Sequence, residues 1–365
     1  LRRLIAIRSR TENRTCFMRP AYAPAPKAQW QTWRDNPAAS AYPFAPMFAA
    51  LLCTVLFSAS AVSARKTTER LGSTEANFVR LIFAPTLMLL VALSFGPALM
   101  GYWHPKVFGL FLLSGAIGFG LGDIALFRAF PLLGSRLTTL IVHCVSVPVA
   151  AITEYFWLGT TMTPQQIVCA VVILAGVAVA LAPKENPNLE RSDLLKGIGW
   201  GLIAAFGQGF GAGVLSRVIT ENVAPTTGVE LDGFHAGITV AVQRMLGGML
   251  FSGLFLLAVR AWLKRKPDSP LAGMTRADGT NDWQGGYPWL LATGLAGPAL
   301  GVTCYQWALL DNATGVVLPI IATTPLVVIP MSIALNEEKP SWRSLTGGVV
   351  AVAGVVGMVL ITRAA

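Results

Sequence analysis

Long apolar runs separated by short polar breaks make up the chain from residue 44 onward. A helix needs about 20 predominantly apolar residues to cross the hydrocarbon core of a bilayer, and these runs have about that length. The pattern predicts an all-α integral membrane protein with ten transmembrane helices. The ten runs lie at approximately 44–64, 78–99, 107–127, 137–158, 167–182, 194–215, 237–259, 289–310, 313–335 and 345–361.

Composition agrees with a chain that is dissolved in lipid. Hydrophobic residues make up 54% of the 365 positions and charged residues only 13%, about half the charged share of an ordinary soluble domain. An ordinary soluble enzyme is therefore excluded. The formal net charge of +10 is no argument for a nucleic-acid partner, because residues 1–46 hold eight basic and two acidic residues and contribute +6 of it.

The first 46 residues form a segment of a different kind. They combine Arg, Pro and Ala without the apolar core of a signal peptide, which is typical of a disordered basic tail. The chain begins with Leu, and Met47 stands just inside the first apolar run. One hypothesis is that the functional protein starts at or near Met47, in which case the tail is not part of the mature protein.

The two halves of the chain resemble each other. The second, third and fourth spans align with the seventh, eighth and ninth, the third and fourth at offsets of 179 and 177 residues. Each half holds five spans, an odd number, so the second half must enter the membrane from the opposite side. The sequence predicts two inverted five-helix repeats, at 47–183 and 194–363. The aligned segments are 122–129 with 301–308, 146–149 with 323–326, and 77–82 with 241–246.

Basic residues in the loops support the inversion. The loop after the first span holds Arg65, Lys66 and Arg70 and the next loop only Lys106, whereas after the sixth and seventh spans the order is reversed. Oppositely oriented repeats should show this swap. The absolute orientation stays open. The positive-inside rule, applied without the tail, places both termini outside, and counting the tail nearly removes the bias.

Several features occur once in each half. An Arg opens the second span, G-x-x-x-x-x-x-A marks the third, a Pro stands two-thirds along the fourth, and the fifth is rich in Gly. This duplicated pattern, over 47–363, resembles the EamA-type transporters of the drug/metabolite transporter superfamily. The resemblance implies ten helices, a central cavity between the halves, termini inside the cell, and movement of small metabolites, often outward.

One segment departs from the family pattern. The family has Leu-Gly-Glu after the fourth span of a repeat, and the second half of this chain has Leu-Asn-Glu-Glu at 335–338. The first half has Leu-Gly-Thr-Thr at 158–161 and so lacks the acid. The difference argues against a strictly symmetric gating role for that acid.

Two prolines occupy matched positions inside the fourth spans of the repeats. Proline removes a backbone hydrogen bond, so Pro148 would free the carbonyl of Cys144, and Pro325 that of Ile321. One interpretation is that both helices are broken and line a cavity at the middle of the membrane. The other is that each proline only kinks a packed helix, which is common in membranes.

Charged residues inside membrane spans are costly and mark either function or a buried pair. Arg80 and Arg244 occupy matched positions near the starts of their spans. They extend to the lipid headgroups, fix helix orientation, or meet an anionic group of the substrate. We expect Asp123 to form an ion pair with Arg128, five residues later, with a proton or cation site as the alternative. Glu154 is expected to reach the membrane interface.

Further polar side chains fall at membrane depth. His143 is either a hydrogen-bonded core residue or, because histidine titrates near neutral pH, a proton-coupling site. Gln208 in the sixth span and three consecutive residues of the eighth either line the cavity or form hydrogen bonds between helices. Those three residues are Tyr305, Gln306 and Trp307.

The sequence shows no motif for metal binding, nucleotide binding or catalysis. Its five cysteines and three histidines lack metal-ligand spacing. Glycine runs at 118–122 and 207–213 lie inside apolar runs and lack the Lys-Ser/Thr of a phosphate-binding loop. The chain has no nucleophile elbow and no paired-carboxylate signature. We expect no enzyme activity, no metal and no cofactor.

These observations predict a secondary transporter that exports a small metabolite, amino-acid-like or another small organic solute, by alternating access in a bacterial inner membrane. Transport is driven either by protons or by the gradient of the substrate. A membrane-embedded enzyme acting on a lipid-linked substrate is one alternative, and it would need a cluster of acids or histidines at one membrane face. A non-transporting scaffold or sensor is another, and it would need a docking motif. The sequence does not predict the oligomeric state.

Overall fold

The computed structural model describes six stretches of the chain and the single residue Ser269. The stretches are 45–94, 104–181, 191–223, 233–266, 281–334 and 342–364. They belong to one compact unit, Phe44–Ala365. Nearly all of the tail, and the acidic segment at 335–338, lie outside the described residues.

The first repeat is a series of apolar helices. A turn at Gly72, with a φ of 85°, separates the first two helices. A second positive-φ glycine, Gly134, separates the third span from the fourth within one long helical stretch, with a φ of 76° and a ψ of 168°. The elements are α4 (Ala45–Leu71), α5 (Ser73–Ser94), α6 (Pro105–Gly115), the π-helix η2 (Ala116–Gly122), α7 (Asp123–Leu158) and α8 (Pro164–Leu181).

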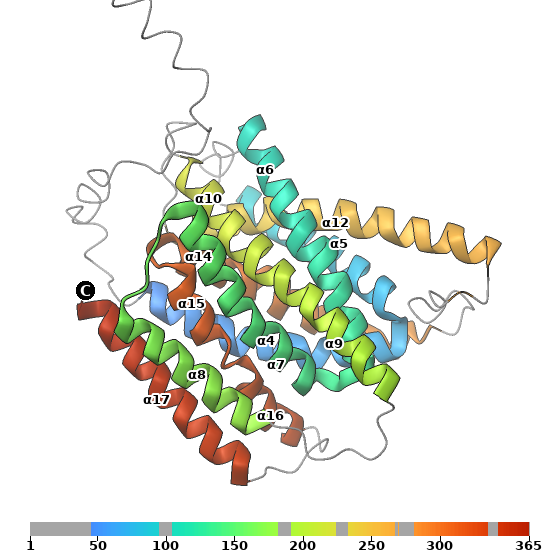
Figure 1. Ribbon diagram of the computed structural model, residues 1–365. Coiled ribbons are helices and arrows are strands. Elements are labelled where there is room, and N and C mark those ends of the chain that lie inside the picture. The colour runs from blue at the N-terminus through green and yellow to red at the C-terminus, as the bar shows by residue number, and fades with distance from the viewer. Residues whose placement is uncertain are drawn as a thin grey trace, which may run out of the picture. The chain divides into compact units, whose positions relative to one another are not determined.

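The second repeat follows the same order. Its sixth span combines α9 (Arg191–Phe206), the π-helix η3 (Gly207–Leu215) and α10 (Ser216–Glu221). The other elements are α12 (Gly233–Arg265), α13 (Trp283–Gly294), the π-helix η5 (Leu295–Gly301), α14 (Val302–Asp311), α15 (Thr314–Ile321), α16 (Thr324–Ala334) and α17 (Trp342–Ala364). Figure 1 shows these helices assembled into one bundle.

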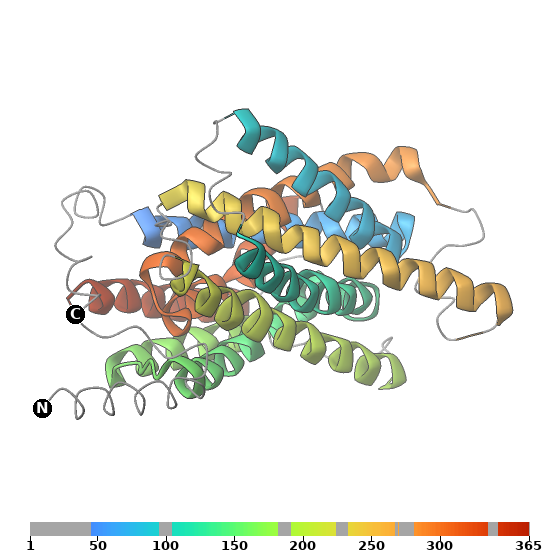
Figure 2. The ribbon, with the colours of Figure 1, turned by 90° about the horizontal axis from the view of Figure 1, so that it is seen from above.

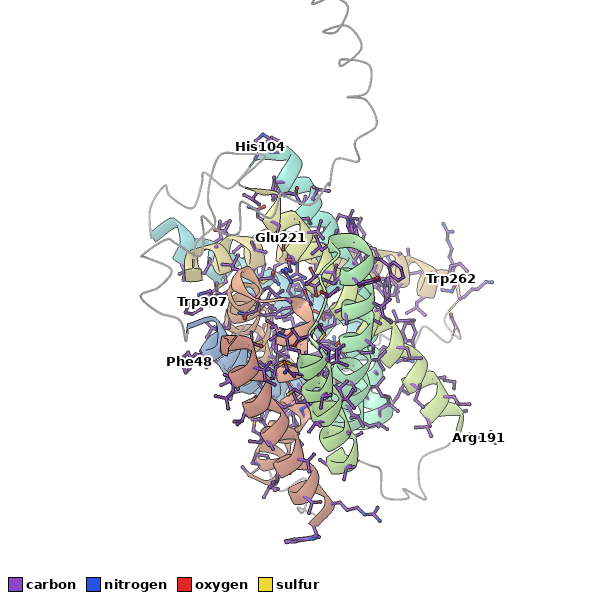
Figure 3. All side chains as sticks on the ribbon, turned by 60° about the vertical axis from the view of Figure 1, so that its left-hand side comes forward. Phe48, His104, Arg191, Glu221, Trp262 and Trp307 are labelled. Atoms are coloured by element: carbon purple, nitrogen blue, oxygen red, sulfur yellow. The ribbon has the colours of Figure 1, made fainter. Side chains whose placement is uncertain are left out.

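The predicted fold class is confirmed. The described residues form a helical segment for each of the ten predicted spans and contain no strand. Seven of the segments are long and apolar enough to cross a membrane, and two shorter apolar helices match the fifth and tenth spans. Large apolar side chains on the outside of the bundle, such as Leu254 on α12 and Val349 on α17, are exposed as lipid contact requires. Phe48 and Trp262 project from the periphery in Figure 3.

Glycine lets the helices of the two repeats approach closely. A Cβ atom at Gly176 of α8 would lie 2.6 Å from the amide nitrogen of Ala351 on α17. These two helices lie side by side in Figure 1, and each is the last helix of its repeat. The helix α12 runs lengthwise beside α6 and η2 (Figure 2), with Gly115 against its backbone. Lipid gives helices no hydrophobic reason to associate, so such backbone contact is a main source of stability.

The internal duplication is visible in the helix geometry. The π-helices η2 and η5 occupy equivalent positions in the alignment of the two repeats. Three glycines recur at these positions, Gly115, Gly118 and Gly122 in the first repeat and Gly294, Gly297 and Gly301 in the second. Each π-helical turn disturbs the regular hydrogen bonding of its helix. Both repeats therefore have the same interruption of regular helix geometry in the middle of their third span.

Replacing Gly115 with alanine tests this packing. The new Cβ atom would overlap the carbonyl oxygen of Arg244, so α6 and α12 must separate. We expect the melting temperature of the purified protein in detergent to fall by about 5 °C or more. Gly109→Ala on the same helix is the control, since a Cβ atom there meets nothing within 4 Å. Equal melting temperatures for the two variants would contradict the role of this contact.

Candidate functional site

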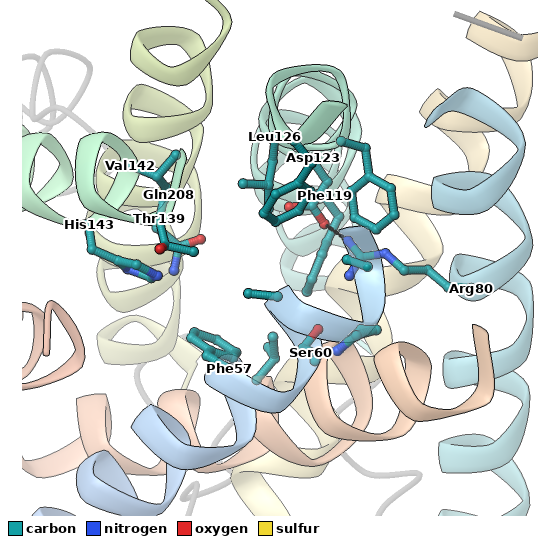
Figure 4. A pocket seen from close by; sticks show the side chains of 17 residues that line it. Phe57, Ser60, Arg80, Phe119, Asp123, Leu126, Thr139, Val142, His143 and Gln208 are labelled. Carbon is teal, nitrogen blue, oxygen red and sulfur yellow. Dashed lines mark hydrogen bonds and ion pairs between the residues drawn. The ribbon is translucent and has the colours of Figure 1, made fainter. Parts of the chain in front are cut away.

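A cavity of about 80 Å³ lies between the two repeats. It is formed by α4, α5, η2 and α7 from the first repeat and by η3, η5 and α14 from the second. Four phenyl rings form much of its wall, those of Phe57, Phe119, Phe127 and Phe130. Six of its lining residues have polar side chains, Ser60, Arg80, Asp123, Thr139, His143 and Gln208 (Figure 4). The cavity thus combines an apolar wall with a small number of polar groups, as small-molecule sites do.

The strongest polar feature of the cavity is an ion pair between two helices. Arg80 on α5 donates from Nη2 to Oδ2 of Asp123 at the start of α7. Its Nε donates to Asn77 over 3.2 Å, and Asn77 donates to Ser252 on α12 over 3.1 Å. The guanidinium also lies 4.3 Å from the ring centre of Phe127. Arg80 is therefore a buried part of the cavity wall and does not extend to the headgroups.

The predicted pair between Asp123 and Arg128 is wrong. Residues five apart lie about 140° apart around a helix axis, so their side chains leave different faces. Asp123 faces α5 and the cavity, whereas Arg128 interacts electrostatically with Asp193 of α9. Within the Arg80–Asp123 pair the carboxylate is the more accessible partner, with 14% of its side chain exposed against 5% for Arg80.

His143 and Gln208 face the same cavity from the other wall. His143 on α7 stacks with the ring of Phe57 at 6.4 Å between centroids. It is 7% exposed, and among the described residues its Nδ1 has no hydrogen-bond partner. Gln208 on η3 is half-buried and lines the cavity beside Thr139. Figure 4 shows the two side chains close together. The structure thus brings together four of the residues singled out in the sequence, namely Arg80, Asp123, His143 and Gln208.

The three polar residues of the eighth span lie elsewhere. Gln306 joins helices, since Ser216 donates to its Oε1 over 2.6 Å and its Nε2 donates to the carbonyl of Ala212. Tyr305 is fully buried and meets Phe57 edge-on behind the cavity wall. Trp307 packs on Gly237 of α12. None of the three is among the described residues that line the cavity, which favours the interhelical interpretation for Gln306.

Arg244 is also fully buried, behind the cavity wall. Its Nε donates to Ser114 over 3.0 Å, and its guanidinium lies 5.2 Å from the ring centre of Phe119. Within the part of the chain that the structure describes, its Nη1 and Nη2 have no hydrogen-bond partner. Extension to the lipid headgroups is thus wrong for Arg244 as well.

The two matched prolines have different surroundings. The helix α7 continues through Pro148, so a helix break there is wrong, and the departure from helical geometry lies at Gly134. The ninth span is interrupted between Ile321 and Thr324, immediately before Pro325. There the hydroxyl of Thr324 donates to the carbonyl of Ile321 over 2.6 Å. A side-chain donor thus satisfies the carbonyl that the proline cannot serve.

A second polar cluster joins three helix ends away from the cavity. Glu154 in the last turn of α7 is buried and pairs with Arg217 of α10, which also donates to Glu221 over 2.9 Å. The two carboxylate oxygens of Glu154 accept the backbone amides of Thr314 and Gly315, each over 3.2 Å, at the start of α15. We call Glu154, Arg217 and the first turn of α15 the Glu154 clamp. Glu154 is therefore held inside the protein by partners from two other helices.

The sequence held a signal for this clamp. An acid in the last turn of an apolar span, with an Arg near the end of another, satisfies the rule that charges at membrane depth are paired. Hydropathy alone did not show that the two helix ends meet. In the described residues, no group of three His, Cys, Asp or Glu side chains could hold a metal ion.

Comparison with known proteins identifies the family. The sequence profile of the EamA-like transporter family matches residues 45–182 and 195–360, and so both repeats. The chain belongs to this family, within the drug/metabolite transporter superfamily, and it is an integral membrane protein of the transporter type.

Comparison with solved structures agrees on the fold. Twenty-nine chains match. One of them, described as "Crystal structure of protein", has a TM-score of 0.62 and 15% sequence identity, over 87% of this chain and 97% of its own length. No curated protein sequence matches the chain.

The buried ion pair can be tested by removing its negative charge. Asp123→Asn leaves Arg80 buried without a counter-ion, which costs about 3–5 kcal/mol in comparable cases. We expect a loss of this size in the free energy of unfolding, measured in mixed micelles titrated with a denaturing detergent. Adding Arg80→Gln should restore part of it, because the two effects are coupled.

The control for this experiment is Glu69→Gln. It removes the carboxylate from the partly exposed pair Arg65–Glu69 and should cost less than about 1 kcal/mol. Strictly additive losses at Arg80 and Asp123 would contradict the pair.

Proposed function

We propose that the protein is a secondary transporter that exports a small organic metabolite by alternating access, with the substrate bound in the cavity between the repeats. The observation that carries this proposal is the position of the cavity. Its lining residues come from both inverted repeats and sit at membrane depth beside the deformable π-helices η2 and η5. Transporters built from inverted repeats bind substrate at the interface of the repeats.

The two polar clusters lie toward opposite faces of the membrane. Ala64, Arg80 and Thr139 are each within about two turns of the helix ends at Gly72 and Gly134, which follow odd-numbered spans. The Glu154 clamp joins helix ends that follow even-numbered spans or begin the next one. Because consecutive spans cross in opposite directions, these ends lie on the other face. The clamp thus closes one face while the cavity lies nearer the other.

The cavity suits a small solute with both polar and apolar parts. Phenyl rings offer an apolar surface, while Asp123, His143, Gln208 and Ser60 offer hydrogen-bonding groups. An amino-acid-like metabolite has this character. Asp123 and His143 are the residues that we propose for proton coupling, because both line the cavity and each can bind a proton. We propose the bacterial inner membrane as the location.

A flux assay tests this function. The full chain is reconstituted in lipid vesicles loaded with a mixture of small metabolites, and loss from the lumen is followed by mass spectrometry with and without an imposed pH gradient. At least one solute should leave faster than from protein-free vesicles, and the gradient should change its rate. His143→Ala and Asp123→Asn should reduce the effect of the gradient. If neither does, the proton sites are wrong, and if no solute moves, transport is wrong.

Weakening the clamp should open the closed face. Glu154→Gln removes the charge that holds Arg217 and the amides of Thr314 and Gly315. Hydrogen bonds to a charged group contribute about 1.5–3 kcal/mol, so the open state should gain at least about tenfold in population. The measurement is the labelling rate of Gln208→Cys, with the native cysteines replaced, by a membrane-impermeant thiol reagent applied from the face of the clamp.

The matched control is Glu221→Gln. Glu221 pairs with the same arginine along one helix, so its removal leaves the bonds from Glu154 to α15 in place and should change the labelling rate little. An unchanged rate in Glu154→Gln would contradict the clamp as a gate.

A further inference from the structure

The two matched arginines occupy equivalent places across the interface of the repeats. A Cβ atom at Gly297 would lie 3.4 Å from Nη1 of Arg80, and one at Gly118 would lie 3.0 Å from Nη2 of Arg244. These two glycines are equivalent in the alignment of the repeats and belong to η5 and η2. Each repeat therefore inserts an arginine against the π-helix of the other repeat.

The symmetry ends at the counter-ion. Asp123, which pairs with Arg80, directly follows η2, and the residue that directly follows η5 is Val302. Arg244 consequently lacks the carboxylate that its counterpart has. Its charge interacts at longer range with Asp123.

The unpaired arginine leaves a positive charge next to the cavity. Arginine stays protonated in proteins, so Arg244 cannot remove its charge by losing a proton. A guanidinium buried without a counter-ion is costly at membrane depth. In the described part of the chain, Asp123 is the carboxylate that lines the cavity, and it already pairs with Arg80. Arg80, Asp123 and Arg244 together carry a net charge of +1.

We propose that the cavity selects small organic anions, with a carboxylate group compensating the charge of Arg244. This proposal rests on the proposed transport function and specifies its substrate class. The guanidinium of Arg244 lies 5.2 Å from the ring centre of Phe119, and that ring lines the cavity. Coulomb interactions are stronger in such a low-dielectric wall than in water. The apolar body of the anion packs on the phenyl rings of Phe57, Phe127 and Phe130.

Three ligands of the same shape and different charge test this selectivity. Benzoate, benzamide and benzylamine share one phenyl ring and carry a negative charge, no charge and a positive charge at neutral pH. Their dissociation constants are measured on the purified full chain in detergent by isothermal titration. We expect benzoate to bind at least about tenfold more tightly than either of the others. Equal affinities, or no binding of benzoate, overturn the proposal.

Giving Arg244 its own carboxylate should remove the selectivity. Val302→Asp places an acid at the position equivalent to Asp123, so the local charge becomes zero. The preference for benzoate over benzamide should fall at least about tenfold, and the melting temperature should rise because Arg244 gains a partner. Val302→Asn is the matched control, with nearly the same size and no charge, and it should keep the preference for the anion. Equal preferences in the two variants overturn the proposal.

Binding and flux measurements distinguish failure of the proposed anion site from failure of the proposed transport function. If benzoate is preferred but no solute crosses the vesicle membrane, the anion site stands and the transport function fails. If vesicles export solutes without regard to charge and the three ligands bind equally, transport stands and the substrate class fails. Arg244→Gln removes the charge itself and should also abolish the preference for benzoate. Monodisperse elution in size-exclusion chromatography shows that this variant is folded.

Discussion

Because a membrane interior holds no water, a charge at that depth is costly unless the protein or a ligand compensates it, and this constraint determines much of the architecture. Arg80 pairs with Asp123, Glu154 with Arg217, and Glu75 with Arg260. Each pair joins different helices, α5 to α7, α7 to α10, and α5 to α12. Removing one partner leaves a costly buried charge. The pairs therefore fix the rotation of the helices about their axes, which apolar packing alone leaves loosely specified.

Glycine supplies the other half of the arrangement. Contacts such as those of Gly176 with α17 and Gly115 with α12 bring backbones so close that each pair of helices behaves as one packed unit. In the third span of each repeat, the π-helices η2 and η5 interrupt the regular hydrogen bonding. A structure with rigid pairs and two equivalent deformable points is suited to exchange between two arrangements of its halves, the motion that alternating access needs.

Duplication explains the symmetry of the backbone, and single residues explain its function. The arginines of both repeats lie against the π-helix of the other repeat. Arg80 has Asp123 as its counter-ion, whereas the equivalent position in the second repeat is Val302. The same holds at the closed face, where Glu154 binds the first turn of α15. A perfectly symmetric pair of inverted repeats would present the same chemistry to both sides of the membrane, and these residues break that symmetry. The proposed anion selectivity and the proposed gate both rest on these departures from the repeat.

The sequence by itself determined the ten helices, their inversion and the family. The length of each span and the duplication can be recognised along the sequence, because neither depends on a tertiary contact. It also singled out Arg80, Asp123, His143 and Gln208, because polar groups at membrane depth are rare and costly. Only the tertiary structure decided what each one meets. Asp123 on α7 faces Arg80 on α5, Glu154 holds α15, and the long helical stretch is interrupted at Gly134 but continues through Pro148. Hydropathy records which residues avoid water. It does not record how each helix is rotated about its axis or which helix lies next to it. The rotation and the neighbouring helix determine which side chain each polar residue meets.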